Sequence, residues 1–238
     1  MARWGMTIDL DRCTGCGGCM SACHQENNLA SADLEESERN SRPFHWLRLL
    51  PEFSGTYPDV TLRYLPQPCF HCDNPPCIKV CPVGATYLGE EGIVGQIYAR
   101  CIGCRYCMAA CPYMAKVFNW YEPEWRGDLK KRANPDVSLR NKGVVEKCTL
   151  CHHRIIRARE KARLEGKAMR DGDVTTACQD SCPARAIQFG DLDNSESRVA
   201  SLSQNSRAFG VHDDLGTRPK VLYLAETRDG TSLDPGGS

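Results

Sequence analysis

Residues 13–23, CTGCGGCMSAC, and residues 101–111, CIGCRYCMAAC, share one cysteine spacing, C-x2-C-x2-C-x3-C. Two further groups complete a set of sixteen cysteines arranged in quartets. The four groups are Cys13, Cys16, Cys19 and Cys23; Cys69, Cys72, Cys77 and Cys81; Cys101, Cys104, Cys107 and Cys111; and Cys148, Cys151, Cys178 and Cys182. The last three groups end in Cys-Pro, at Pro82, Pro112 and Pro183. This grouping predicts a fold built around groups bound by cysteine sulfur.

The shared spacing is that of bacterial ferredoxins, in which cysteine thiolates hold iron–sulfur clusters. Closely spaced cysteines reach three irons of a [4Fe–4S] cubane from one loop, and a remote cysteine reaches the fourth. In two-cluster ferredoxins the last cysteine of one group binds the other cluster. Proline directly after that cysteine fixes φ and removes a donor, so the chain turns away. Sixteen cysteines therefore predict four [4Fe–4S] clusters and an electron-transfer protein.

Two other uses of cysteine are less consistent with the sequence. Disulfide scaffolds are typical of small secreted domains, whereas 238 residues are enough to bury a core. The run Cys148-x2-Cys151-His152-His153 is zinc-like in isolation. Cys178 and Cys182-Pro183 complete a ferredoxin-type quartet there, which favours a cluster over zinc.

The bulk composition excludes some classes of protein. Apolar residues make up 41% and charged residues 25%, and the formal net charge is zero, so no basic surface for nucleic acid is expected. The sequence has no apolar run of about 18 residues and no signal-peptide pattern at its start. We therefore expect any membrane contact to be made through a partner.

Short strands are expected to lead into or follow the cysteine groups. Alternating Met6, Ile8 and Leu10 predict a strand within residues 5–12. The other expected strands are 45–50, 60–66, 92–100, 116–120, 143–147 and 186–192, with a turn over 51–59. Residues 24–42 and 121–141 are expected to be loops. Residues 152–172, rich in Arg, Lys, Ala and Leu, predict an exposed helix ending near Gly172, which covers a cluster or contacts a partner.

Beyond these patterns, the chain closely resembles the four-cluster electron-transfer subunit of the complex iron–sulfur molybdoenzymes. That family serves dimethyl sulfoxide, polysulfide, tetrathionate, arsenate and nitrate reductases. The chain is also similar to the iron–sulfur part of alternative complex III. The stretches that carry the resemblance are IDLDRCTGCGGCMSACHQENN, CFHCDNPPCIKVCPVGAT, CIGCRYCMAACPY, EKCTLC, CPARAIQFGDLD and GTRPKVLYL, and it covers roughly residues 3–225.

The resemblance implies nested pairing of the cysteine groups, the first with the fourth and the second with the third. Carried over by position, the ligand sets are Cys13, Cys16, Cys19 and Cys182 for cluster 1; Cys23, Cys148, Cys151 and Cys178 for cluster 2; Cys69, Cys72, Cys77 and Cys111 for cluster 3; and Cys81, Cys101, Cys104 and Cys107 for cluster 4. Some relatives replace one ligand of cluster 4 and hold a [3Fe–4S] centre. Cys104 fills the middle position of its loop, so four intact cubanes are expected.

The expected fold class is α+β, with two ferredoxin-like dicluster modules of short strands, cysteine loops and loop or helix insertions. The first module comprises residues 1–23 and 143–190, and the second comprises residues 66–120. Residues 24–65 and 121–142 are expected to be connecting segments, and 191–238 a C-terminal tail.

The resemblance implies a subunit without substrate chemistry of its own. It would relay single electrons between a molybdopterin-type catalytic subunit and a quinone-reactive, polytopic membrane subunit, on the outer, periplasmic-type face. No nucleotide-binding glycine motif or nucleophile–base pair argues for catalysis by this chain. The alternatives are the iron–sulfur subunit of an alternative complex III with a multihaem cytochrome, of a hydrogenase or formate dehydrogenase, or a freestanding soluble polyferredoxin.

Overall fold

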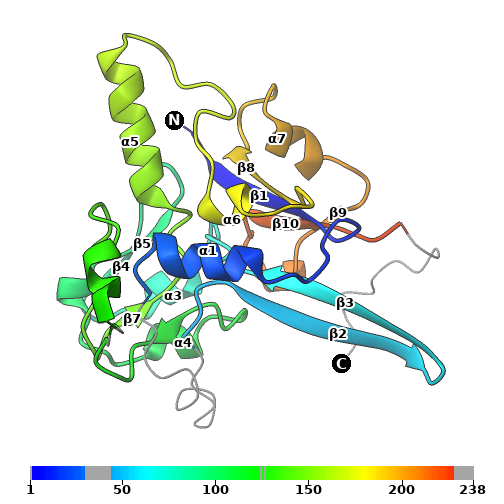
Figure 1. The fold of residues 1–238 in the computed structure, drawn as a ribbon, viewed down its shortest axis with the longest axis horizontal. Helices are drawn as coiled ribbons and strands as arrows, with labels where there is room; N and C mark the ends of the chain where they lie inside the picture. Colours follow the sequence, from blue (N-terminus) through cyan, green and yellow to red (C-terminus); the bar gives the residue numbers. More distant parts are fainter. Residues whose placement is uncertain (1, 30–43, 124, 126, 228–238) are drawn as a thin grey trace.

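The computed structural model describes residues 2–29, 44–123, 125 and 127–227. Short helices and small sheets follow one another along the chain (Figure 1), so the expected α+β class is confirmed. The helices are α1 (Gly18–Glu26), α3 (Pro76–Lys79), α4 (Tyr106–Ala109), α5 (His152–Leu164), α6 (Ala177–Asp180) and α7 (Arg198–Ser203). Short 3-10 helices are η1 (Tyr98–Arg100), η2 (Gly127–Arg132) and η3 (Asp213–Leu215).

The strands form one four-stranded sheet and three two-stranded sheets. They are β1 (Trp4–Asp9), β2 (Arg48–Thr56), β3 (Asp59–Gln67), β4 (Thr86–Leu88), β5 (Val94–Gln96), β6 (Val117–Phe118), β7 (Val145–Glu146), β8 (Ile187–Asp191), β9 (Ala208–Phe209) and β10 (Val221–Leu224). The large sheet has the order β8-β1-β10-β9, and the pairs are β2-β3, β4-β5 and β6-β7. Each expected strand therefore has a counterpart, although several are shorter than expected.

The large sheet joins the beginning and the end of the described chain. β1 pairs in parallel with β10, Met6 facing Val221, and antiparallel with β8, Ile8 facing Ile187. Met6, Ile8 and Val221 are fully buried and belong to the main core. The segment expected to be a tail, 191–238, thus contributes β9 and β10 to the sheet that leads into the first cysteine group.

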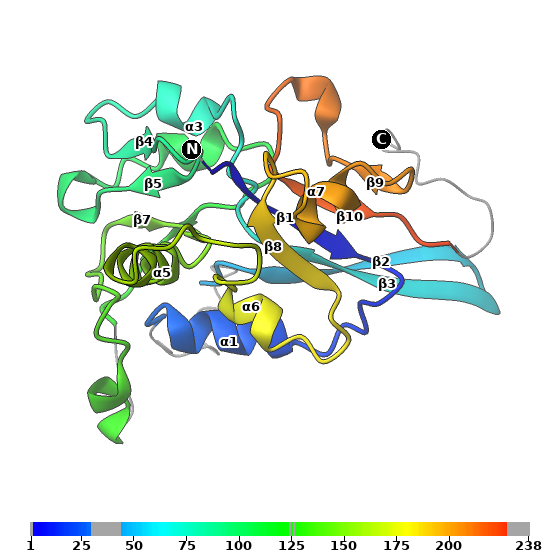
Figure 2. The same cartoon turned by 90° about the horizontal axis from the view of Figure 1, so that it is seen from above.

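The short helices pack in two pairs. α1 packs against α6, and α3 against α4. Figure 2 shows α1 and α6 side by side, with α3 on the opposite side of the molecule. Since α1 and α6 carry cysteines of the first and fourth groups, while α3 and α4 carry those of the second and third, the packing brings these groups together in the same nested order.

Three expectations about element boundaries were wrong. The turn expected over 51–59 is confined to Tyr57 and Pro58, because β2 continues through Pro51 to Thr56. Pro51 is tolerated because a two-stranded hairpin consists only of edge strands. The helix expected to reach Gly172 ends at Leu164. Two residues later Gly166 has a positive φ of 64°, a conformation that commonly ends helices. The expected loop over 24–42 lies partly outside the described residues, and residues 24–26 belong to α1.

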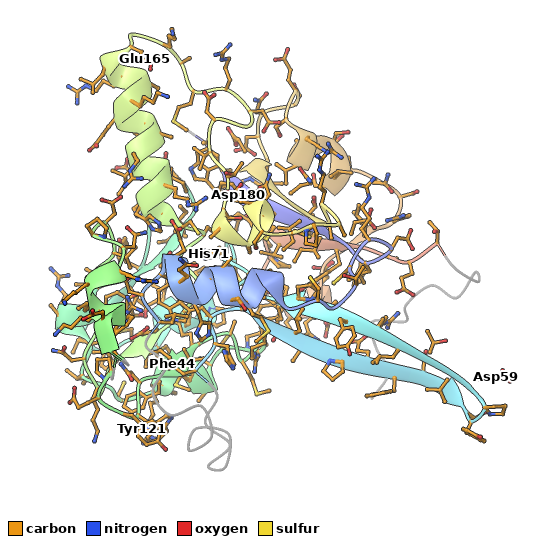
Figure 3. All side chains as sticks on the ribbon, in the orientation of Figure 1. Phe44, Asp59, His71, Tyr121, Glu165 and Asp180 are labelled. Atoms are coloured by element: carbon orange, nitrogen blue, oxygen red, sulfur yellow. The ribbon has the colours of Figure 1, made fainter. Side chains whose placement is uncertain are left out.

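Two elements extend from the body. The β2–β3 hairpin projects to the right in Figure 1, and Figure 3 places Asp59 at its tip. α5 extends in another direction, with Glu165 at its far end (Figure 3). Most of the helix is exposed, although Ile155 near its start is fully buried.

Candidate iron–sulfur cluster sites

Each cysteine group places at least one cysteine in a short helix: Cys19 and Cys23 lie in α1, Cys77 in α3, Cys107 in α4 and Cys178 in α6. The two loops of identical spacing also share a backbone conformation. Gly15 and Gly103 have φ of 67° and 68°, and Gly17 and Arg105 form left-handed N-caps with φ of 77° and 62°. At Gly15 a Cβ would lie 2.2 Å from the Tyr64 ring, so the close approach of β3 requires glycine. The sequence repeat is therefore also a structural repeat.

The structure brings three thiols of the first group together with Cys182. Burial raises the pKa of Cys13, and the nearby Cys182 and Cys16 sulfurs raise it further. Burial likewise raises the pKa of Cys19 to about 11, with contributions from Cys13, Cys16 and Cys182. A small pocket lies among these four cysteines, next to Pro183.

The fourth thiol of the first group, Cys23, lies elsewhere. Burial raises its pKa well above the usual value, and Cys148, Cys178 and Cys151 raise it further. All four of these cysteines are buried. The first and fourth groups thus contribute to two shared sets of thiols.

The second and third groups interleave in the same way. Burial raises the pKa of Cys72 to about 12, and the sulfurs of Cys69, Cys111 and Cys77 add to the effect. Cys107 has a raised pKa, mainly from burial, and its neighbouring sulfurs are those of Cys101, Cys81 and Cys104. In each of the four expected ligand sets the thiols are neighbours in the structure, and their assignment to individual clusters stays a prediction.

Backbone N–H groups point at the sulfurs. The N–H of Ala85 donates to Cys81 Sγ at 3.2 Å, that of Val145 to Cys101 Sγ at 3.4 Å and that of Ala186 to Cys182 Sγ at 3.3 Å. Such donors stabilise a thiolate and hence a negatively charged cluster. At Cys81, burial raises the pKa but N–H groups of residues 83, 85 and 86 outweigh it, so the net pKa is lowered. This donor set fits [4Fe–4S] clusters.

Neighbouring sets follow one another in a file. Cys19 lies near Cys178, which connects the first set to the second, and Cys148 lies near Cys69, which connects the second to the third. Cys77 and Cys81 lie on or next to α3 and connect the third set to the fourth. Among the sixteen cysteines, all of which the structure describes, only Cys16 and Cys104 are exposed. They belong to the sets at the two ends.

His71 occupies the centre of the molecule and is fully buried (Figure 3). Burial, together with the Lys147, Lys220 and Lys116 cations, lowers its pKa well below the usual range, so the ring is neutral. Its Nδ1 accepts from the N–H of Val94 at 3.1 Å, which leaves Nε2–H to donate to the Cys148 carbonyl at 3.0 Å. The imidazole therefore fixes the backbone between the second and third sets rather than binding metal.

Several polar residues near the sulfurs were not identified from the sequence. Asn27 Nδ2 lies 3.6 Å from Cys23 Sγ, and Thr176 Oγ1 lies 3.2 Å from Cys178 Sγ. Lys116 and Lys147 are buried close to the second, third and fourth sets. The only signal for the two lysines was their position in predicted strands, Lys116 in KVF and Lys147 in VVEKC. Apolar neighbours on both strands favour burial of that part of the chain.

The described residues contain neither a compact single-metal site nor a helix able to span a membrane. Within the described ranges, no three His, Cys, Asp or Glu side chains lie close enough together to hold a single metal ion. No helix in that same part of the chain is both long and apolar enough to cross a bilayer.

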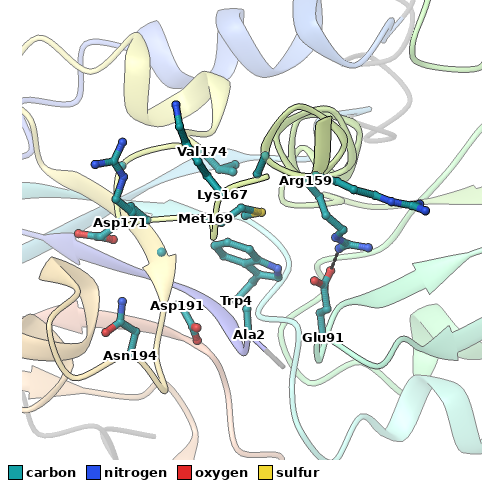
Figure 4. Close-up of a pocket in the computed structure, with 15 residues that line it drawn as sticks. Ala2, Trp4, Glu91, Arg159, Lys167, Met169, Asp171, Val174, Asp191 and Asn194 are labelled. Carbon is teal, nitrogen blue, oxygen red and sulfur yellow. Dashed lines mark ion pairs between the residues drawn. The ribbon is translucent and has the colours of Figure 1, made fainter. Parts of the chain in front are cut away.

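A hollow beside α5, away from the thiols, is lined by Trp4, Met169 and Asp171 and bordered by the Arg159–Glu91 ion pair (Figure 4).

Comparison with known proteins finds iron–sulfur domain matches over residues 12–127. Two models, both described as 4Fe-4S dicluster domain, match residues 12–85 and 60–127. The chain is 50% identical to the "Menaquinone reductase, iron-sulfur cluster-binding subunit" of Nitratidesulfovibrio vulgaris, covering 94% of this chain and 89% of the relative.

Two further relatives belong to other reductases. The chain is 40% identical to the iron–sulfur subunit of a putative dimethyl sulfoxide reductase of Halobacterium salinarum, over 94% of this chain and 79% of the relative. It is 35% identical to the iron–sulfur subunit of an arsenate respiratory reductase of a Shewanella species, over 93% and 96%. The matches thus cover nearly the whole chain and nearly the whole of two relatives.

Proposed function

Because the chain belongs to the family of four-cluster iron–sulfur subunits of complex iron–sulfur molybdoenzymes and related quinone oxidoreductases, we propose how its electrons enter and leave. The chain is an electron-transfer subunit with four [4Fe–4S] clusters, and subunits of this kind work in multi-subunit reductase complexes. Our proposal is that it connects a molybdopterin-type catalytic subunit to a polytopic membrane subunit that reacts with quinone.

The proposed ligand assignment follows the four groups of neighbouring thiols. Cluster 1 is assigned to Cys13, Cys16, Cys19 and Cys182; cluster 2 to Cys23, Cys148, Cys151 and Cys178; cluster 3 to Cys69, Cys72, Cys77 and Cys111; and cluster 4 to Cys81, Cys101, Cys104 and Cys107. Each bound cluster supplies one-electron chemistry. The chain's own part is to hold the thiolates, donate N–H groups to them and exclude water from the middle of the file.

The observation that carries the proposal is the exposure of the two terminal sets. Cys16 in set 1 and Cys104 in set 4 are exposed, whereas set 2 is wholly buried. An electron relay needs approachable ends and an insulated middle. The file of four sets therefore supports a path in which electrons enter at one end and leave at the other.

The surfaces around the two exposed cysteines differ, and this supports an orientation. Ile102 and Tyr106, each two residues from Cys104, are 65% and 60% exposed. Exposed apolar side chains of this size mark interaction surfaces when they cluster. The loop around Cys16 carries Thr14, Gly15 and Gly17 instead. We therefore place the membrane subunit at cluster 4 and the catalytic subunit at cluster 1.

The proposed electron acceptor is a menaquinone-type naphthoquinone held in the membrane subunit. This step rests on the relative at 50% identity, which is named for menaquinone reduction. We further propose that the chain is a peripheral subunit held at the outer membrane face by its partners. Protease treatment of intact cells and of cells with a permeabilised outer barrier would locate the chain; protection in both, but not after lysis, would contradict the outer face.

The proposed placement of the two partner subunits is tested with two variants of the assembled complex. Cys104→Ser changes the membrane end of the file, and Cys16→Ser changes the catalytic end. The first variant should abolish electron transfer to a menaquinone analogue but preserve exchange between a soluble dye and the catalytic subunit. Cys16→Ser should abolish transfer from the catalytic subunit and leave exchange between dye and quinone. Intact quinone reduction in an assembled Cys104→Ser complex would contradict the proposed exit.

The identity of the catalytic partner has its own test. Metal analysis of the purified complex should find molybdenum or tungsten beside cluster iron. Haem iron without either metal would instead identify a complex of the alternative complex III type. Purification of the chain alone, with no larger subunit, would contradict both arrangements.

A further inference from the structure

A buried ammonium group lies between the third and fourth sets of thiols. Lys116 follows the third cysteine group and is only 4% exposed. Its Nζ donates to Thr86 Oγ1 and to Gln96 Oε1, each at 3.1 Å. Neither acceptor carries a charge. Because an ammonium ion is costly to bury without compensating charge, its balancing charge must come from elsewhere nearby.

The cysteine ligands of sets 3 and 4 lie close to this cation. Lys116 is near enough to Cys77 and Cys107 for charges at these positions to interact. The N–H of Ala85, next to Thr86, donates to Cys81 Sγ at 3.2 Å. Cys77 belongs to set 3 and Cys107 to set 4. Thr86, which accepts the hydrogen bond from Lys116, also contacts Cys81 of set 4 through its N–H and its side chain. Lys116 is therefore held in place by groups that also surround the cluster ligands.

We propose that the buried Lys116 ammonium sets the reduction potentials of clusters 3 and 4, holding both higher than an uncharged side chain would. Reduction adds one electron to a cluster without making or breaking a bond to Lys116. A nearby cation stabilises the added negative charge, and low-dielectric surroundings strengthen that interaction. Lys116 acts through the clusters and their ligands and is a positioning residue, not a catalytic one. The inference rests on the ligand assignment proposed above.

A second buried lysine offers an internal comparison. Lys147 is 1% exposed, and its Nζ donates to the Cys148 carbonyl at 2.8 Å. Its cation interacts with Cys69 and Cys77 of set 3 and with Cys148 of set 2. Loss of the Lys147 charge should therefore affect clusters 2 and 3, whereas loss of the Lys116 charge should affect clusters 3 and 4.

The test is a redox titration of the purified complex followed by electron paramagnetic resonance. Lys116→Met and Lys116→Gln remove the charge, and the glutamine can still hydrogen-bond within the Thr86 and Gln96 site. Both should shift clusters 3 and 4 to lower potential and leave cluster 1 unchanged, with a full iron content. Lys116→Arg should keep potentials closer to the wild type. The titration uses redox mediators, so it does not depend on which partner or quinone is natural.

Lys79→Met is the matched control. Lys79 lies in α3 between Cys77 and Cys81 and is exposed, so water screens its charge. An equal shift in Lys79→Met would overturn the proposal, as would wild-type potentials in both neutral Lys116 variants. Loss of clusters in both neutral variants, with retention in Lys116→Arg, would also overturn it and identify a structural role instead.

Discussion

Removing the negative partner of the buried Arg140–Glu146 ion pair should destabilise residues 143–148, the segment that leads into Cys148. Arg140 Nε lies 3.0 Å from Glu146 Oε2, and the two side chains are 2% and 1% exposed. Trp46 Nε1 donates to the same oxygen at 3.1 Å. Glu146→Gln keeps most of the shape but leaves the Arg140 cation without its counter-charge.

The expected loss is about 3 to 5 kcal/mol, the usual cost of breaking a buried pair by removing one partner. Arg140 retains the Asn28 carbonyl as an acceptor at 3.1 Å and lies over the Trp46 ring at 5.0 Å. These contacts favour the lower end of the range. About 3 kcal/mol corresponds to roughly a hundredfold increase in the opening equilibrium.

Hydrogen exchange of the holoprotein, followed by mass spectrometry, measures this change. Amides of residues 143–148 should exchange roughly a hundredfold faster in Glu146→Gln than in the wild type. Asp128→Asn is the surface control. It breaks the Asp128–Lys131 pair, whose side chains are both 78% exposed, and should cost less than about 1 kcal/mol.

A double variant separates the buried charge from the loss of shape. Arg140→Met with Glu146→Leu removes both ions and should be less destabilised than Glu146→Gln alone. If the double variant exchanged as fast as the single one, the uncompensated cation would not be the cause. Equal protection in Glu146→Gln and Asp128→Asn would refute the buried pair as a source of stability.

Three further outcomes are expected. The purified subunit should contain about sixteen irons and sixteen acid-labile sulfides, the content of four cubanes, and about twelve irons with bound zinc would contradict one quartet. Cys182→Ser should perturb the same electron paramagnetic resonance signal as Cys16→Ser and leave the signal that responds to Cys104→Ser unchanged; a centre common to Cys182 and Cys178 would contradict nested sharing. The hydrogen bond from Arg154 lowers the pKa of Glu26 to about 2, so the stability it contributes is present above its usual value of 4.5 and lost as pH falls from there towards 2. Glu26→Gln should remove that part of the acid dependence, measured as the denaturant concentration that bleaches the cluster absorbance; an unchanged acid profile would count against the Glu26–Arg154 contact.

The sequence was most informative where local chemistry determines local structure. Alternation around Met6 and Ile8 identified β1, and the C-x2-C-x2-C spacing identified the loops, because both signals extend over a few residues. Cofactor type followed from the number and spacing of the cysteines. The end of α5 was missed because Arg, Lys and Ala continue past Leu164 with good helix propensity. Gly166 was the available signal for the earlier end.

Long-range pairing could not be read from local patterns. Nothing in the run VLYL indicates that β10 lies parallel to β1. The alternation of side chains along a strand shows which face is buried, but it does not determine which other strand pairs with it. The nested ligand sets also came from family resemblance, since the spacing of Cys19 and Cys23 is equally compatible with other partner groups. The proposed role of Lys116 depends on Thr86, Gln96 and the cysteines of sets 3 and 4, which come together only in the folded chain.

The two exposed cysteines give the repeat a functional consequence. Cys16 and Cys104 occupy the same middle position of the C-x2-C-x2-C loop, in the two segments with matching backbone conformation. The repeated cysteine loop therefore provides one exposed ligand per copy. Nested interleaving places these copies at opposite ends of the file, and the thiols of the other two groups are buried or partly buried between them. Two approachable ends and a shielded middle follow from the repeated loop and its packing together, and in our proposal the different side chains around Cys16 and Cys104 suit two different partners.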